Sequence, residues 1–243
     1  MMVDELRNFG VAFSDAEGSW TPELRAEMRK KGMAIVMGSL GGWQKLSFAW
    51  EFMMTKRRAA RADLSRFRER GVRNETFLRQ QMEYLSVFSA LAAVLGSDAA
   101  VGVMKEVMDQ TAKKALLLCL PEAEKMQRFE DPFGAWRDYA RASPAAAREA
   151  GTQDLRIAED NRDAFQFDVT WCVWLELART LGVPEACLPN CYSDDLVFPE
   201  YFAALGIRYT RTQTLAGGGA CCDFRFVRAK NSEPEVPSSP SEE

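Results

Sequence analysis

The sequence contains no histidine among its 243 residues. Histidine is the side chain that most often acts as a general base near neutral pH, and it is a common ligand of zinc and non-haem iron. Ser-His-Asp triads, Cys-His dyads, HExxH zinc sites and facial-triad iron sites are therefore excluded. Any catalysis must rest on thiols, carboxylates, hydroxyls and arginines.

The sequence also lacks an apolar run of the ~18–20 residues that a membrane span requires. The longest candidate, residues 87–104, is interrupted by Ser89, Ser97 and Asp98. Charged residues at positions 4, 5 and 7 do not fit the basic-then-apolar order of a signal peptide. We therefore expect a cytoplasmic protein with no membrane span.

Nucleotide and nucleic-acid motifs are absent as well. No GxGxxG or phosphate-loop pattern occurs, so nucleotide binding has no support. Residues 56–73 contain eight basic residues, but Phe67 is the only aromatic residue among them, whereas nucleic-acid surfaces interleave the two kinds. We interpret this stretch as a solvated helix face that binds no nucleic acid, and contact with an anionic membrane or a partner stays open.

The composition is that of a folded protein, with 47% hydrophobic and 27% charged residues. The formal net charge of −4 comes from 31 basic and 35 acidic residues. Residues 231–243 contain four Glu and no basic residue and are rich in Pro and Ser, so we expect a disordered acidic tail. The rest of the chain is balanced in charge, so the net charge does not indicate what the protein binds.

Helical periodicity dominates the first part of the chain. After an N-terminal arm, residues 1–20, the apolar side chains of residues 21–150 recur at helical spacing. We expect aromatic and Met residues here to pack in the core rather than to line a ligand pocket. The apolar helices also leave a homodimer open. The aromatic and Met residues that we expect in the core are Trp43, Trp50, Phe52 and Met53.

Residues 151–230 follow a different pattern. After a polar stretch at 151–163, the side chains at 165–172 alternate between apolar and polar, which predicts a strand. Helical spacing then resumes and stops at Gly182. This part of the chain is expected to carry the functional motifs.

The end of this region predicts a loop, a short helix and a hairpin. The loop contains Cys187 and Cys191, and the helix covers 198–205. Two β-type runs, 207–215 and 221–227, are joined by a glycine-rich link. The predicted fold class is α+β, with a helical N-terminal half and a small antiparallel sheet with helices in the C-terminal half.

Thiols are concentrated in the second half, where five of the six cysteines lie between positions 172 and 222. In a reducing compartment we expect thiols rather than disulfides. Zinc sites usually show a CxxC pair, which is missing here, so a thiolate-bound metal is the less favoured interpretation, and the sequence demands no cofactor. The cysteines are Cys119, Cys172, Cys187, Cys191, Cys221 and Cys222.

Cys172 is the first candidate for catalysis. It lies where the predicted strand meets the predicted helix, and a helix N-terminus lowers a thiol pKa from ~8.5 into the range ~3.5–7.5. Asp168 is expected on the same side of the strand, and Thr170 is an alternative helix cap. A buried, unreactive thiol is the other interpretation of Cys172.

A second group of candidates lies in the predicted loop. Cys191 and Asp194 are three residues apart, and Asp195 follows directly. Paired aspartates in a loop often serve turns or helix caps. The functional interpretation of Asp194 is a general base or a cation-binding carboxylate.

The predicted hairpin offers further polar side chains. Thr210 and Thr212 share one face of its first strand, and Arg211 lies on the other, where it is solvated if that face points away from a pocket. Cys222 lies on the apolar face of the second strand. The glycines at 217–219 form a turn or, alternatively, expose N–H groups to an anion.

Short motifs follow one another in a fixed order between Phe165 and Phe226. In this combination they resemble the L-2-amino-thiazoline-4-carboxylic acid hydrolase family. The resemblance implies a hydrolase that opens a 2-aminothiazoline ring to N-carbamoyl-L-cysteine, or that opens a related cyclic amidine. The motifs are Asp168-x-Thr170-x-Cys172, Leu181-Gly182, Cys191-x-x-Asp194, Arg211-Thr212-Gln213-Thr214, the glycines and Cys222-Asp223-Phe224.

The resemblance marks positions, and the reaction chemistry suggests their roles. We expect Cys172 to act as nucleophile or acid–base, with Asp168 or Asp194 binding the amidinium or activating water. Arg211 is expected to bind the substrate carboxylate. The catalytic candidates are Cys172, Asp168, Asp194, Cys191 and Cys222. The substrate-binding candidates are Arg211, Thr212, Thr210, Gly218 and Asp223.

Two other functions stay open. A glycine-rich turn followed by Cys-x-Phe also resembles the small-ligand-binding domain of the 4-vinyl reductase type, which implies a binding or sensor module. An interaction protein built on residues 21–150 is the third interpretation. Only a hydrolase has turnover that a change at Cys172 would remove.

Overall fold

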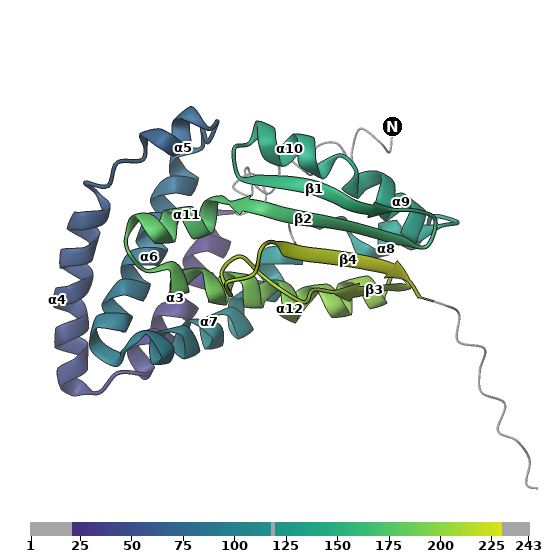
Figure 1. Ribbon diagram of the computed structural model, residues 1–243. Coiled ribbons are helices and arrows are strands. Elements are labelled where there is room, and N and C mark those ends of the chain that lie inside the picture. Colours follow the sequence, from purple (N-terminus) through teal and green to yellow (C-terminus); the bar gives the residue numbers. More distant parts are fainter. Residues whose placement is uncertain (1–20, 118–119, 230–243) are drawn as a thin grey trace, which may run out of the picture.

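The computed structural model describes residues 21–117 and 120–229 (Figure 1). The expected N-terminal arm, Cys119 and the expected acidic tail lie outside the described residues. Helices form the N-terminal half, and a four-stranded antiparallel sheet with further helices forms the C-terminal half, which confirms the predicted fold class. None of the helices in the described ranges is long and apolar enough to cross a membrane.

The helical half begins at a capped terminus, where Oγ1 of Thr21 accepts a hydrogen bond from the N–H of Leu24 at 3.2 Å. Its two longest helices, α6 and α7, are joined by Gly96, whose φ of 87° suits glycine. The helices are α3 (Pro22–Gly38), α4 (Gly42–Ala59), α5 (Ser65–Glu69), α6 (Glu75–Leu95), α7 (Ser97–Leu117), α8 (Ala123–Met126), α9 (Pro132–Ala140) and α10 (Ser143–Glu149).

The sheet has the strand order β1-β2-β4-β3, and all neighbouring strands are antiparallel. The predicted strand at 165–172 is confirmed as β2. β1 lies in the polar stretch, where no strand was predicted, because an edge strand can be largely charged. The elements are β1 (Gln153–Asp160), β2 (Ala164–Cys172), α11 (Val173–Thr180), the 3-10 helix η1 (Pro184–Cys187), α12 (Leu188–Ala203), β3 (Ile207–Thr210) and β4 (Cys222–Arg228).

Two hydrophobic clusters build the core. The first joins the N-terminal helices with α11, whose Val173 and Leu177 are fully buried. The second lies under the sheet, where Phe165 of β2 and Phe226 of β4 pair across the strands and pack with α9 and α12. Because α11 directly follows β2, one short segment connects the two clusters.

The predicted loop around Cys187 and Cys191 is wrong, because residues 188–203 form the single helix α12. Pro189 lies in the first turn of α12, where a missing N–H costs nothing. Burial of apolar side chains such as Phe198 and Phe202 against the sheet stabilises the helix despite Pro199 in its interior.

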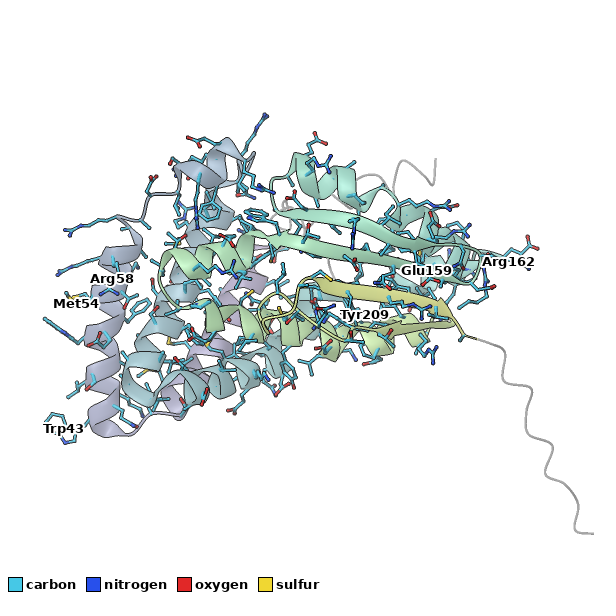
Figure 2. All side chains as sticks on the ribbon, in the orientation of Figure 1. Trp43, Met54, Arg58, Glu159, Arg162 and Tyr209 are labelled. Atoms are coloured by element: carbon cyan, nitrogen blue, oxygen red, sulfur yellow. The ribbon has the colours of Figure 1, made fainter. Side chains whose placement is uncertain are left out.

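The prediction that the aromatic residues of α4 pack in the core is wrong for Trp43 and Trp50, which are 83% and 58% exposed. Met53 is also exposed, whereas Phe52 packs partly against the first cluster. The buried side of α4 faces α6. Trp43 lies at the N-terminal end of α4, and Met54 and Arg58 lie further along the helix, on the side that points away from the rest of the molecule (Figure 2).

Two arginines of the basic stretch 56–73 contact other elements of the fold. Arg66 donates to the carbonyl of Glu176 at 3.0 Å and to the hydroxyl of Thr180 at 2.8 Å. Arg70 pairs with Asp154 and lies over the Trp171 ring. These arginines hold the α5 region against α11 and the sheet, so part of the basic stretch has a structural role.

Candidate active site

A cavity of about 410 Å³ lies between the two core clusters. Its walls come from α3, α6, α7 and α11 on one side, and from β1, β2, β4, η1, α12 and the segment after β3 on the other. Five of the predicted site residues line it, namely Cys172, Cys191, Asp194, Arg211 and Cys222. The structure thus brings together residues that are up to 50 positions apart in the sequence.

Cys172 occupies the N-cap position of α11, as the strand-to-helix transition predicted. A hydrogen bond with the Cys187 thiol and the backbone N–H groups of Leu175 and Trp174 lower its pKa below the ordinary value, although burial acts in the opposite direction. The alternative that Thr170 caps the helix is wrong, since its hydroxyl donates to the carbonyl of Asp154 at 3.4 Å.

Asp168 does not share a side with Cys172, and this prediction is wrong because of a β-bulge. Leu155 of β1 pairs with Val169 and Asp154 with Trp171, which leaves Thr170 as an extra residue on β2. The extra residue reverses the alternation, so Cys172 lines the cavity together with Val169.

The carboxylate of Asp168 is held by neighbours and is not part of the cavity wall. It accepts hydrogen bonds from Arg156 at 2.7 Å and from Gln166 at 2.9 Å. Only 4% of Asp168 is exposed. Its carboxylate therefore accepts hydrogen bonds from side chains of the sheet and does not bind a ligand in the cavity.

Three thiols, those of Cys172, Cys187 and Cys191, form a hydrogen-bonded chain. Cys187 forms hydrogen bonds with both Cys172 and Cys191, and together with burial these raise its pKa well above the ordinary value. Cys187 is therefore a protonated donor. It was not among the predicted site residues, although its spacing of four from Cys191 places both on one face of a helical turn. The spacing could be used only if the helix α12 had been predicted, and a loop was predicted there instead.

The five cysteines of the described ranges are free, which confirms the expected thiols for them. Cys221 lies outside the cavity wall, whereas Cys222 is part of it. Burial raises the pKa of Cys222 to about 12, and its sulfur accepts the N–H of Leu215 at 3.2 Å. Among the described side chains, no group of three or more carboxylates or thiols is arranged to hold a metal ion.

Asp194 and Arg211 form a buried ion pair in the cavity wall, with Nη1 of Arg211 at 2.8 Å from Oδ2 of Asp194. The guanidinium also donates to the Cys191 carbonyl at 2.6 Å and to Asp195 at 2.7 Å. Its side chain is only 3% exposed, so the alternative of a solvated Arg211 is wrong.

The carboxyl of Asp194 is suited to proton transfer near neutral pH. Burial raises its pKa to about 7, against the lowering effect of the Arg211 charge and hydrogen bond, and Asp195 adds to the rise. A base with this pKa is partly ionised at pH 7 and can both take and return a proton.

Asp223 explains why β3 ends at Thr210 instead of continuing to residue 215. Its carboxylate accepts the N–H of Thr212 at 2.9 Å, the Thr212 hydroxyl at 2.5 Å and the N–H of Gln213 at 2.8 Å. A side chain therefore replaces the strand ladder and fixes the segment that carries Arg211. Thr210, Thr212 and Asp223 themselves are outside the cavity wall.

The glycine-rich segment is a turn and not an anion site. The N–H groups of Gly217 and Gly219 donate to the carbonyl of Thr214 at 3.1 and 2.9 Å, and that of Gly218 donates to Leu215 at 3.2 Å. Gly218 has a φ of 86°, which requires glycine, and it does not line the cavity. The alternative of exposed N–H groups for a ligand is wrong here.

The helical half supplies the opposite wall, which sequence reasoning did not assign to the site. Phe77 and Tyr84 of α6, Met104 and Met108 of α7 and Met28 of α3 line the cavity. They carry no motif, because apolar residues at helical spacing look the same whether they face a core or a ligand.

Taken together, the fold and the cavity define an α+β protein whose site combines a low-pKa thiol with an arginine-paired carboxyl. The family model of L-2-amino-thiazoline-4-carboxylic acid hydrolase matches residues 76–226, and the protein belongs to this family. The match begins in α6, so it includes helices of the cavity wall as well as the motifs at 165–226. No curated protein and no solved structure matched the chain.

Proposed function

We propose that this protein hydrolyses the ring of a small 2-aminothiazoline of the L-2-amino-thiazoline-4-carboxylate type, or of a related cyclic amidine, with Cys172 as the nucleophile. The observation that carries the proposal is the cavity in which the low-pKa thiol of Cys172 and the carboxyl of Asp194 both lie. Membership of the hydrolase family supports the reaction class.

In the first step the Cys172 thiolate attacks C2 of the ring, the carbon bonded to two nitrogens and one sulfur. A bond forms between this carbon and the Cys172 sulfur, and the ring C–S bond breaks with its electron pair on the ring sulfur. The leaving thiolate has an ordinary pKa of ~8.5, so its departure needs no strong acid. The carbon is then attached to Cys172 as an isothiourea.

In the second step Asp194 removes a proton from a water molecule that attacks the same carbon. The bond to Cys172 breaks and its sulfur returns to the thiolate state. The second proton of the water passes to the former ring nitrogen, and the carbon becomes the carbonyl of an N-carbamoyl product. The proton taken by Asp194 passes to the new thiol of the product. Water is the only co-reactant, and no histidine is needed.

The other candidates hold these two groups in place. Cys187 donates its S–H to Cys172 and favours the thiolate, and Cys191 continues this chain. Arg211 fixes Asp194, and we propose that its remaining N–H groups bind the substrate carboxylate. Asp223 acts through Arg211 as a positioning residue, and Asp168 has no step in this scheme.

The proposal is tested by incubating the protein with L-2-amino-thiazoline-4-carboxylate and following N-carbamoyl-L-cysteine by mass spectrometry. Quenched reactions should also show the isothiourea adduct on the peptide that contains Cys172. Binding without product would favour the ligand-binding module instead, and turnover with no adduct and full activity of Cys172→Ser would remove Cys172 from the nucleophile role.

A further inference from the structure

One wall of the cavity is not needed to bind the polar groups of a simple aminothiazoline carboxylate. The thiols, Asp194 and Arg211 account for the ring carbon, the water and the carboxylate of such a substrate. They all come from β2, η1, α12, β4 and the segment after β3. The wall across from them comes from α3, α6, α7 and the first turn of α11 and is mainly apolar, with Phe77, Met104, Met108, Ala115, Leu116 and Trp174 among its side chains. Its polar side chains are Arg25, Gln80, Gln81, Tyr84 and Thr111.

This apolar wall is long. The cavity-lining residues of α7 extend from Met104 to Leu116, which corresponds to about 18 Å along a helix that rises 1.5 Å per residue. The cavity volume of about 410 Å³ lies in the range of sites for drug-sized ligands. A five-membered ring with one amino group and one carboxylate fills only a fraction of this space.

Two of the polar side chains in the apolar wall form hydrogen bonds with backbone carbonyls of the protein. The hydroxyl of Thr111 donates to the carbonyl of Val107 at 2.7 Å, and the hydroxyl of Tyr84 donates to the carbonyl of Ala186 at 2.9 Å. These two hydroxyls therefore do not require a polar ligand. The wall also contains an edge-to-face pair of Phe77 and Trp174, with ring centroids 5.5 Å apart.

From this division we infer that the substrate is a cyclic amidine that carries an apolar substituent, an aryl or alkyl group larger than the ring, seated along α7. The inference rests on the proposed function, because the thiol and carboxyl groups fix the end of the cavity that holds the ring. Flexible methionine side chains and aromatic edges suit such a group, since they adapt to irregular apolar shapes.

Binding and turnover of two probes test the inference, namely 2-amino-thiazoline-4-carboxylate and its 5-phenyl derivative. We expect the phenyl derivative to bind at least about tenfold more tightly by calorimetry, which is the usual effect of filling an apolar pocket. Equal or weaker binding of the phenyl derivative would overturn the inference. Ring opening of the parent compound alone would leave the proposed function intact in that case.

Two variants locate the substituent. Ala115→Phe fills the wall and should remove the tenfold preference for the phenyl derivative. Gln110→Phe introduces the same side chain on the exposed side of α7 and is the control. Met108→Gln should reduce the preference without filling the space, so the outcome does not depend on one overpacked variant.

The two proposals fail separately. If neither probe is opened but the phenyl derivative still binds more tightly in an Ala115-dependent way, the reaction is wrong and the ligand class stands. If the preference persists in Ala115→Phe and in Met108→Gln, the substituent does not lie along α7 and the inference is overturned, whatever the rates of ring opening.

Discussion

Several hydrogen-bond donors converge on the sulfur of Cys172 and lower its pKa although no histidine is present. The Cys187 thiol comes from the end of η1, and two backbone N–H groups come from the first turn of α11. Cys222 lies in the same cavity wall but has the opposite character, since burial raises its pKa to about 12. The pKa values of two thiols in one cavity are thus shifted in opposite directions by their immediate surroundings.

This difference predicts selective alkylation. At pH 7 iodoacetamide should modify Cys172 well before Cys222, since only a thiolate reacts and the pKa of Cys172 is lowered. Peptide mapping by mass spectrometry after short exposure measures both rates in one sample, with Cys222 as the internal control. Equal labelling of the two cysteines would contradict the assignment.

Asp194 predicts the pH dependence of the reaction. Because burial raises its pKa to about 7 and the proposed base is the ionised carboxylate, kcat/KM should rise about tenfold per pH unit below pH 7 and level off above it. Asp194→Asn should lower kcat/KM by about 10²–10⁴-fold and remove this rising limb. Unchanged rate and profile in Asp194→Asn would exclude the base role, and Glu106→Gln, at an exposed position of α7, is the control.

At the scale of elements, the junction of β2 with α11 was predictable because a change from twofold to helical periodicity is visible in the sequence. The bulge at Thr170 was not, since it changes the pairing with β1 and leaves the composition of β2 unaltered. The sequence therefore located Cys172 correctly but placed Asp168 on the wrong side. Only the pairing of strands decides which of the two faces the cavity.

Two other elements show how side chains override local patterns. The prolines and paired aspartates of α12 are typical of loops, and the packing of its apolar face on the sheet outweighs them. The strand prediction for 207–215 failed because Asp223 takes the N–H groups of Thr212 and Gln213. Both errors arise from long-range contacts that periodicity does not record.

The carboxylate of Asp223 predicts a local loss of order in its absence. Asp223→Ala should lower the free energy of unfolding by about 1 kcal/mol, because hydrogen bonds to Thr212 and Gln213 are lost. It should also lower kcat/KM while leaving the pH profile intact, since Arg211 is less well positioned. Urea unfolding and rate measurements check both effects, and a shifted pH midpoint would instead indicate direct participation in proton transfer.

On the scale of the whole molecule, the site is shared by the two halves of the chain. The division into residues 21–150 and 151–230 remains a prediction, and residues of both parts line the cavity. The sequence motifs identified the wall that carries Cys172, Asp194 and Arg211, because the motifs restrict residue types there. The apolar wall on α3, α6 and α7 has no such restriction, which is why it could be found only in the folded molecule.

The homodimer also remains a prediction, and α4 provides its test. Trp43, Leu46 and Trp50 leave a large exposed apolar area on the edge of the molecule that faces away from the sheet (Figure 1). If copies associate through this face, Trp50→Glu should convert a dimer into a monomer in size-exclusion chromatography with light scattering, with Glu51→Gln on the same helix as control. A wild-type monomer at high concentration would contradict the prediction.

The central claim is that this protein opens a 2-aminothiazoline ring through Cys172. The initial rate of N-carbamoyl-L-cysteine formation from L-2-amino-thiazoline-4-carboxylate tests it most directly, in the wild type, in Cys172→Ser and in the control Cys221→Ser, whose thiol lies outside the cavity wall. The account predicts product from the wild type and from Cys221→Ser, and a rate at least about 10³-fold lower for Cys172→Ser. No product from the wild type, or equal rates for all three proteins, would contradict it.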